Sequence, residues 1–158
     1  MGDITLYDDD ILLWSEQQAA AIRRWARARD IPNELDIENV AEEIESVGRS
    51  ELAAVESYIE LMFVHLIKLF AEPESPSVRH WRAEVAGFNS KCRRRYAPSM
   101  RQRIDLDMIW RAARDQQLLA YDGEAHQRVA SLAAQSPFGL DELIAERIDV
   151  FGLEKRLR

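Results

Sequence analysis

The 158 residues are enough to bury a hydrophobic core in one domain, and the net charge is −7. Hydrophobic residues make up 47% and charged residues 31%, which is ordinary for a globular protein and excludes a disordered one. The single Cys92 excludes an intrachain disulfide, and the apolar run 61–69 is too short and too polar for a membrane span. The first residues lack the pattern of a signal peptide. We therefore expect one domain over residues 1–158, in a cytoplasmic protein without a membrane partner.

The first helix is predicted from about Asp9 or Asp10 to Arg29, because few glycines or prolines interrupt this part of the chain. The segment Ile31-Pro32-Asn33 should end it, since proline restricts the residue before it. Apart from the polar Gln18, one stripe at helical spacing is apolar and should face inward: Ile11, Trp14, Ala21, Ile22 and Trp25.

The second predicted helix begins after Asp36, a favourable N-cap, with Leu35 and Val40 spaced for a hydrophobic staple. Glycine commonly follows the last residue of a helix, so Gly48 could mark the end of this one. The sequence therefore allows either a break at Gly48, with a new helix from Ser50, or one continuous helix kinked there. The predicted inward stripe consists of Ile37, Val40, Ile44 and Val47.

The helix from about Ser50 to Ala71 is apolar nearly all round, which predicts burial on several sides. Its main stripe consists of Leu52, Val55, Ile59, Met62, Leu66 and Phe70. We expect this helix to lie at the centre of the fold.

Further helices follow a proline loop. One is predicted over about Ser77–Tyr96, and another over roughly Met100–Tyr121 with Ser99 as its cap. Two short ones are expected near 124–134 and 140–150. The apolar stripes indicate a buried Cys92 and core positions for all four tryptophans, Trp14, Trp25, Trp81 and Trp110. The fold class is therefore predicted to be all-α, a single-domain helical bundle of five main helices plus one or two short C-terminal helices.

Charge is distributed unevenly along the chain. Residues 1–48 carry twelve acidic side chains against four basic ones, whereas residues 79–114 carry ten basic against three acidic. Segments of opposite sign can pack near each other and neutralise, which is the interpretation we favour.

The best candidate site is a polar cluster on the second and third predicted helices. Glu42 and Glu45 are three residues apart, and Glu45 and Arg49 four apart, so each pair can meet on a helix surface. A neighbouring helix could bring a carboxylate close to His65, where burial and pairing would shift pKa values. The cluster is either a pocket for proton transfer or, as we favour, an ionic network that sets helix register. Its members are Glu42, Glu43, Glu45, Arg49, His65 and Lys68.

A second candidate surface is a basic segment around Tyr96. It could meet nucleic-acid phosphates or an acidic partner, although solvated helix ends also collect cations. Its members are Lys91, Arg93, Arg94, Arg95, Arg101 and Arg103.

Metal and cofactor motifs are lacking. Carboxylate-bridged metal bundles use Glu-x-x-His pairs. The residues three positions before His65, His80 and His126 are not glutamates. We therefore expect no bound metal and no cofactor.

Several segments resemble a bacterial family. They are residues 39–51 (NVAEEIESVGRSE), 65–68 (HLIK), 97–100 (APSM) and 136–143 (SPFGLDEL). Together with Tyr7, Trp14 and Trp81, they are similar to domain-of-unknown-function family twenty-nine. The resemblance covers most of the chain and implies an all-helical bacterial cytoplasmic protein. It implies no reaction.

Small size, acidity and charge asymmetry favour a protein-interaction or regulatory module, adaptor-like or antitoxin-like, over an enzyme. A protein partner or self-association is therefore expected. Two alternatives remain. One is a small-molecule-binding protein or enzyme that uses Glu43, His65 and Lys68; the other is nucleic-acid binding through residues 91–103.

Overall fold

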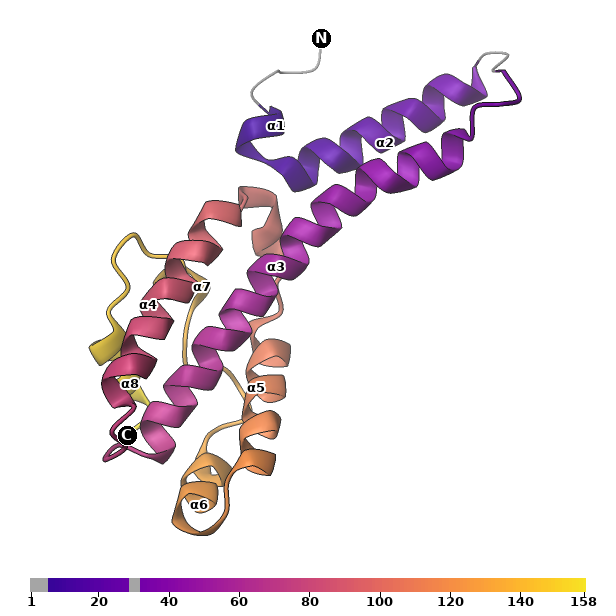
Figure 1. Cartoon of the computed structure of the whole chain (residues 1–158). Coiled ribbons are helices and arrows are strands. Elements are labelled where there is room, and N and C mark those ends of the chain that lie inside the picture. Colours follow the sequence, from indigo (N-terminus) through magenta and orange to yellow (C-terminus); the bar gives the residue numbers. More distant parts are fainter. Residues whose placement is uncertain (1–5, 29–31) are drawn as a thin grey trace. The chain divides into compact units, whose positions relative to one another are not determined.

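The chain is all-α, as predicted. A computed structural model describes residues 6–28 and 32–158, and the regular elements within these ranges are helices (Figure 1). The predicted helix end at Arg29 and the break at Ile31 lie outside the described residues. In chain order the elements are α1 (Leu6–Asp9), α2 (Ile11–Arg27), α3 (Ile37–Ala71), α4 (Val78–Arg95), the 3-10 helix η1 (Pro98–Gln102), α5 (Leu106–Ala120), α6 (Gly123–Ser131), α7 (Leu140–Leu143) and α8 (Val150–Arg156).

The chain divides into two compact units. The smaller consists of Met1–Ala54 with Tyr96–Arg103, and the larger of Val55–Arg95 with Ile104–Arg158. The boundary falls within α3, so this helix contributes residues to both units. The single domain over residues 1–158 stays a prediction.

In the smaller unit, Asp10 joins the start of α2 to the segment that contains η1. The Asp10 side chain caps α2 by accepting a hydrogen bond from the Leu13 amide at 3.0 Å. It also accepts from the Ser99 amide at 2.9 Å and from the Ser99 hydroxyl at 2.6 Å. Burial opposes the charged form of Asp10, but these hydrogen bonds outweigh it and lower its pKa.

The helix does not break at Gly48: α3 runs without interruption from Ile37 to Ala71. Gly48 instead permits a close contact between α2 and α3. A Cβ atom at this position would lie 2.2 Å from Ser15 Oγ and 3.0 Å from the Leu12 Cα atom. Ala19 and Ala41 are also fully buried, so small side chains bring the two antiparallel helices together.

The predicted inward stripes of the smaller unit are partly wrong. The buried residues of α2 are Leu12, Ser15 and Ala19 rather than Trp25, whose side chain is 47% exposed. On α3, Val40 and Val47 are 40% and 44% exposed. The predicted stripes are displaced because Ala41 and Gly48, which allow the closest approach, are small and carry little hydrophobic signal.

The larger unit is built around the second half of α3, as the sequence predicts. Phe63 contacts Trp110 of α5, with ring centroids 5.3 Å apart, and Phe138 at 6.0 Å. Trp110 is fully buried, and its indole N–H donates to the Ala133 carbonyl at 2.9 Å. The α3 residues in this core are Val55, Ile59, Met62, Phe63, Val64, Leu66, Ile67 and Leu69.

Two polar contacts fasten the C-terminal segment to α4. Asn89 is buried and donates to the Leu143 carbonyl at 2.7 Å and the Ala145 carbonyl at 3.1 Å. Arg82 makes two hydrogen bonds to the buried carboxylate of Glu154 in α8. These contacts satisfy polar groups that would be costly to bury alone.

Other helix boundaries also differ from prediction. Ser99 does not cap a helix that begins at Met100; it lies in η1 and donates to Asp10. The N-cap of α5 is Asp105, which accepts from the Met108 amide at 3.0 Å. After α6, two short helices, α7 and α8, replace the single helix predicted over 140–150.

The contact at Gly48 leads to a stability prediction. Gly48→Ala should lower the free energy of unfolding by roughly 1–3 kcal/mol, because the added methyl group overpacks the contact with Ser15 and Leu12. Gly87→Ala is the matched control. Its Cβ would meet nothing within 4 Å, so alanine should instead stabilise α4 by about 0.5–1 kcal/mol. Urea unfolding monitored by circular dichroism measures both changes, and equal effects of the two variants would contradict the packing argument.

Candidate functional site

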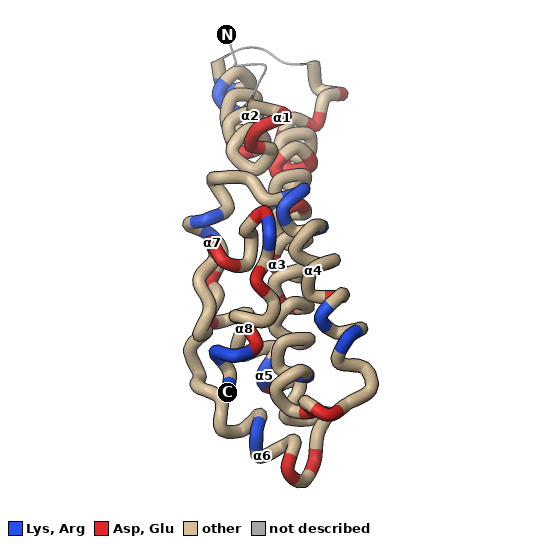
Figure 2. The backbone as a smooth tube through the Cα atoms, turned by 90° about the vertical axis from the view of Figure 1, so that its left-hand side faces the viewer, with Lys and Arg blue, Asp and Glu red and all other residues tan. Residues whose placement is uncertain are grey.

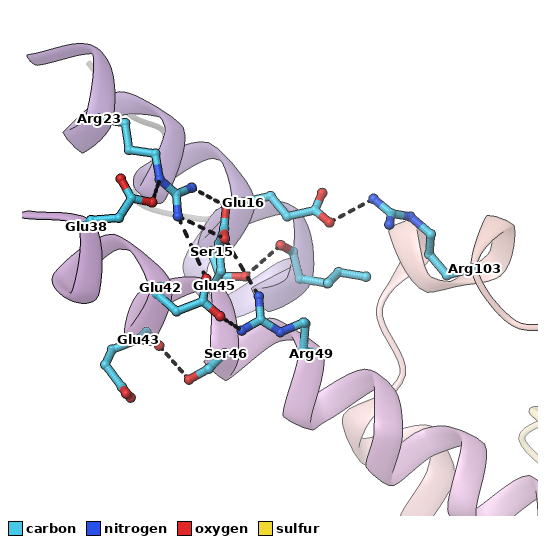
Figure 3. Close-up of polar contacts among 11 residues, drawn as sticks. Ser15, Glu16, Arg23, Glu38, Glu42, Glu43, Glu45, Ser46, Arg49 and Arg103 are labelled. Atoms are coloured by element: carbon cyan, nitrogen blue, oxygen red, sulfur yellow. Dashed lines mark hydrogen bonds and ion pairs between the residues drawn. The ribbon is translucent and has the colours of Figure 1, made fainter. Parts of the chain in front are cut away.

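Arg23 of α2 lies at the centre of an ion-pair network in the smaller unit (Figure 3). Its guanidinium donates to Glu38 at 2.8 Å and to Glu45 at 2.6 Å, and Glu42 lies 3.9 Å away. The hydrogen bonds from Arg23 lower the pKa of Glu45, and those to Glu45 and Glu38 raise the pKa of Arg23. The network therefore fastens the side of α2 to the side of α3.

Arg49 extends this network along α3. It forms an ion pair with Glu42 and lies 3.7 Å from Glu45. The predicted pairing of Glu45 with Arg49 is present, but the sequence analysis did not identify Arg23 as the central cation. Glu43 is exposed and points away from both arginines in Figure 3, where its backbone carbonyl accepts a hydrogen bond from Ser46 at 2.8 Å.

His65 and Lys68, the other members of the predicted cluster, belong to the larger unit. The Nδ1 atom of His65 donates to the Leu61 carbonyl at 2.8 Å, and its ring lies 5.3 Å from that of Phe88. Burial lowers the pKa of His65. A carboxylate from the second predicted helix would face His65 only if the chain reversed direction near Gly48, and α3 makes no such turn. The structure does not bring Glu43 and His65 together.

The predicted basic surface is also shared between the units. Lys91, Arg93, Arg94 and Arg95 lie on α4 in the larger unit, where the last turn is basic (Figure 2). Arg93 donates to the Glu146 carbonyl at 3.2 Å. Arg101 and Arg103 belong to the smaller unit, where Arg103 pairs with Glu16 at 2.7 Å. The Glu16–Arg103 pair is one contact of the kind expected between the acidic segment 1–48 and the basic segment 79–114.

One side of the α2–α3 hairpin is apolar, a feature that the sequence analysis missed. Each residue turns a helix by about 100°, so Val40 and Glu42 flank the buried Ala41 on opposite sides. On α2, Gln18 and Ala20 flank the buried Ala19 in the same way.

The ion pairs of Arg23 with Glu38 and Glu45 lie along one edge of the contact between α2 and α3. The side of α2 that carries Gln18 and the side of α3 that carries Val40 therefore meet along the opposite edge. We call this surface the apolar edge. Its apolar residues are Trp14, Trp25, Val40 and Val47, and the polar Gln18 lies among them.

Surface hollows are further candidate sites, and two of them are described by their lining. The first, of about 550 Å³, lies along α2 and is lined by Leu13, Glu16, Gln17, Gln18, Ala20, Ala21 and Arg24. The second, of about 320 Å³, belongs to the larger unit and is lined by Phe70, Pro73, Glu74, Arg128 and Arg158. Within residues 6–28 and 32–158 no three His, Cys, Asp or Glu side chains are grouped to hold a metal ion.

Comparisons with known proteins give the chain a family but no reaction. Residues 6–148 match the model of the domain of unknown function DUF29, and the chain belongs to this family. It is similar to an alpha-helical protein of unknown function from Rhodospirillum rubrum ATCC 11170, known from a crystal structure. The two chains are 33% identical over 96% of each, with a TM-score of 0.84. No curated protein matches the sequence. No helix in the described part of the chain has the length and apolar character needed to cross a membrane.

Loss of Arg23 should destabilise the smaller unit more than loss of its neighbour Arg24. Arg23→Gln leaves Glu38, Glu42 and Glu45 without their shared cation, so the melting temperature should fall. Arg24→Gln removes the same charge from an exposed position that makes no ion pair with the described residues. Because the pKa of Glu45 is lowered, its contribution is present above its ordinary value of 4.5 and is lost as pH falls through the lowered value. Thermal melts from pH 7 to pH 3 should therefore show the difference between the variants disappearing; a constant difference would refute this assignment.

His65 should titrate below its ordinary pKa of 6.5, because burial disfavours the charged imidazolium. Folding then favours the neutral ring, so the contribution of His65 to stability is present above pH 6.5 and is lost as pH falls through the lowered pKa. NMR titration of the ring protons measures the pKa in the folded chain and, in urea, in the unfolded chain. Equal values in both states would show that the ring is not buried in solution.

Proposed function

We propose that this chain is a protein-interaction module, adaptor-like or antitoxin-like, that acts in the cytoplasm and binds a helix of another protein at the apolar edge. The observation that carries the proposal is the contrast between the two sides of the α2–α3 hairpin. Ion pairs of Arg23 close one side. On the other side Trp25, Val40 and Val47 remain 40–47% exposed. Large apolar side chains gathered on one surface are typical of interaction sites.

The dimensions of the apolar edge suit a helical partner. Trp14 and Trp25 are eleven residues apart on α2, which corresponds to about 16 Å of helix rise. A partner helix of about three turns would cover this length. Its apolar residues at helical spacing would pack between α2 and α3, in the manner of a helix in a groove. Tryptophan is a frequent energetic centre of such interfaces.

Charge favours a basic partner. The described residues of the smaller unit include eleven acidic side chains and six basic ones. Asp36 and Glu43 are exposed on the side of α3 next to Val40 and Val47. A partner helix with Lys or Arg beside its apolar stripe would complement them, whereas a second copy of this chain would bring like charges together.

The proposal can be tested by site-specific photo-cross-linking in host cells. A photo-reactive phenylalanine analogue at Val47 should cross-link a discrete partner segment. The matched control is the same analogue at Ser46, the next residue, which turns away from the apolar edge. The cross-linked segment, identified by mass spectrometry and synthesised as a peptide, should be an apolar helix with basic residues.

The purified peptide then decides the outcome. Its affinity for the chain should fall by at least about tenfold with Val47→Glu, which buries a charge at the interface. Ser46→Glu adds the same charge one residue away and should leave the affinity unchanged. Equal cross-linking at both positions, cross-links confined to a second copy, or a peptide without basic residues would each refute the proposed interaction.

A further inference from the structure

A separate surface in the larger unit combines aromatic rings with lysines. It lies along α3 and α4 and does not involve the apolar edge. We call it the aromatic strip, and its members are Tyr58, His65 and Lys68 on α3 with Trp81, Phe88 and Lys91 on α4.

Phe88 is the centre of this strip. Its ring centroid lies 5.3 Å from that of His65 and 6.5 Å from that of Tyr58, and the planes of Tyr58 and Phe88 are inclined by only 23°. All three residues are partly exposed, unlike the fully buried Phe63 and Trp110 of the core. The three rings therefore form an aromatic surface that is partly open to solvent.

Each end of the strip carries a lysine beside a ring. The Lys91 ammonium lies 5.5 Å from the centroid of Phe88, and the Lys68 ammonium lies 6.0 Å from that of Trp81. Lysine has a flexible stem, so each ammonium can turn from the ring to a phosphate without disturbing the helix. Tyr58 and Lys68 are ten residues apart on α3, or about 15 Å of helix rise. Neighbouring rings of the strip lie 5.3 and 6.5 Å apart, so a strip of this length has room for more than one base.

His65 adds a polar group with a defined orientation. Its Nδ1–H donates to the Leu61 carbonyl, so in the neutral ring Nε2 is a hydrogen-bond acceptor. This atom can accept a hydrogen bond from a base amino group or a sugar hydroxyl. The charged or titratable groups that act on His65 are Lys68 of α3 and Glu84 and His80 of α4. As a whole, α4 carries six basic residues and one acidic residue.

We infer that the aromatic strip binds single-stranded nucleic acid, with bases stacked on the partly exposed rings and phosphates paired with Lys68 and Lys91. Proteins that bind single strands combine aromatic platforms with cations in this way. An acidic peptide could pair with the lysines, but it would leave the ring faces without a partner. Because the chain as a whole carries a charge of −7, attraction by its entire surface cannot supply the binding.

Fluorescence anisotropy with a labelled oligothymidylate of about twelve nucleotides tests this inference on the full chain at low salt. Phe88→Leu keeps an apolar side chain but removes the ring, and should raise the dissociation constant at least about tenfold. The double variant Lys68→Gln, Lys91→Gln should raise it by a similar factor. The matched control, Arg147→Gln with Lys155→Gln, removes two positive charges from exposed positions in the same unit and should change it less than about twofold.

The remaining outcomes are also decisive. The inference would be overturned by an absence of binding to the wild-type chain, by equal weakening in the control variant, or by poly-glutamate displacing the oligonucleotide as well as unlabelled oligothymidylate does. Circular dichroism confirms that each variant is folded. If Phe88→Leu fails to fold, the double variant Lys68→Gln, Lys91→Gln decides the outcome by its dissociation constant, because both lysines are accessible to solvent. None of these outcomes depends on the apolar edge, so the proposed protein interaction is tested separately.

Discussion

The continuity of α3 is the constraint on which the rest of the structure depends. One helix of 35 residues supplies the packing surface of both compact units, and the two halves do this with different chemistry. Ala41 and Gly48 let α2 approach closely, whereas Phe63, Leu66 and Ile67 fill a core with bulky side chains. With a break at Gly48, residues before and after it would have formed two separate helices. Gly48 serves the contact with α2 instead, and α3 continues through this position.

The larger unit was the easier part to predict from the sequence. Residues 50–71 are apolar nearly all round, and the positions expected to be buried, such as Ile59 and Met62, are fully buried. Hydrophobic periodicity failed along the contact between α2 and α3, where several buried positions are small. Val40 and Val47 belong to the apolar stripe predicted there, yet the neighbouring Ala41 and Gly48 occupy the interface. A pattern based on hydrophobicity cannot recognise an interface that depends on the absence of side-chain volume.

In the candidate site, contacts between residues close in sequence could be predicted, whereas contacts between distant residues could not. Glu45 and Arg49 are four residues apart, so helical spacing alone predicted that they could pair. The ion pair of Glu42 with Arg49 spans seven residues and was not predicted. Arg23 is 15 residues from Glu38, and only the packing of α2 on α3 brings it into the network. The proximity of His65 to Phe88 likewise required tertiary structure. Composition predicted an interaction module but gave no means of locating the apolar edge, because that surface exists only once the other side of the hairpin is closed.

The bond between Asp10 and Ser99 has a consequence for the order in which the chain folds during synthesis. The smaller unit is discontinuous: its first part ends at Ala54, and its last part begins at Tyr96. On a ribosome that makes the chain from its N-terminus, the α2–α3 hairpin emerges well before Ser99 does. Until then the Asp10 carboxylate lacks two of its three hydrogen-bond donors. The start of α2 therefore gains its full set of hydrogen bonds only after α4 has been completed, although α2 itself is made before α4.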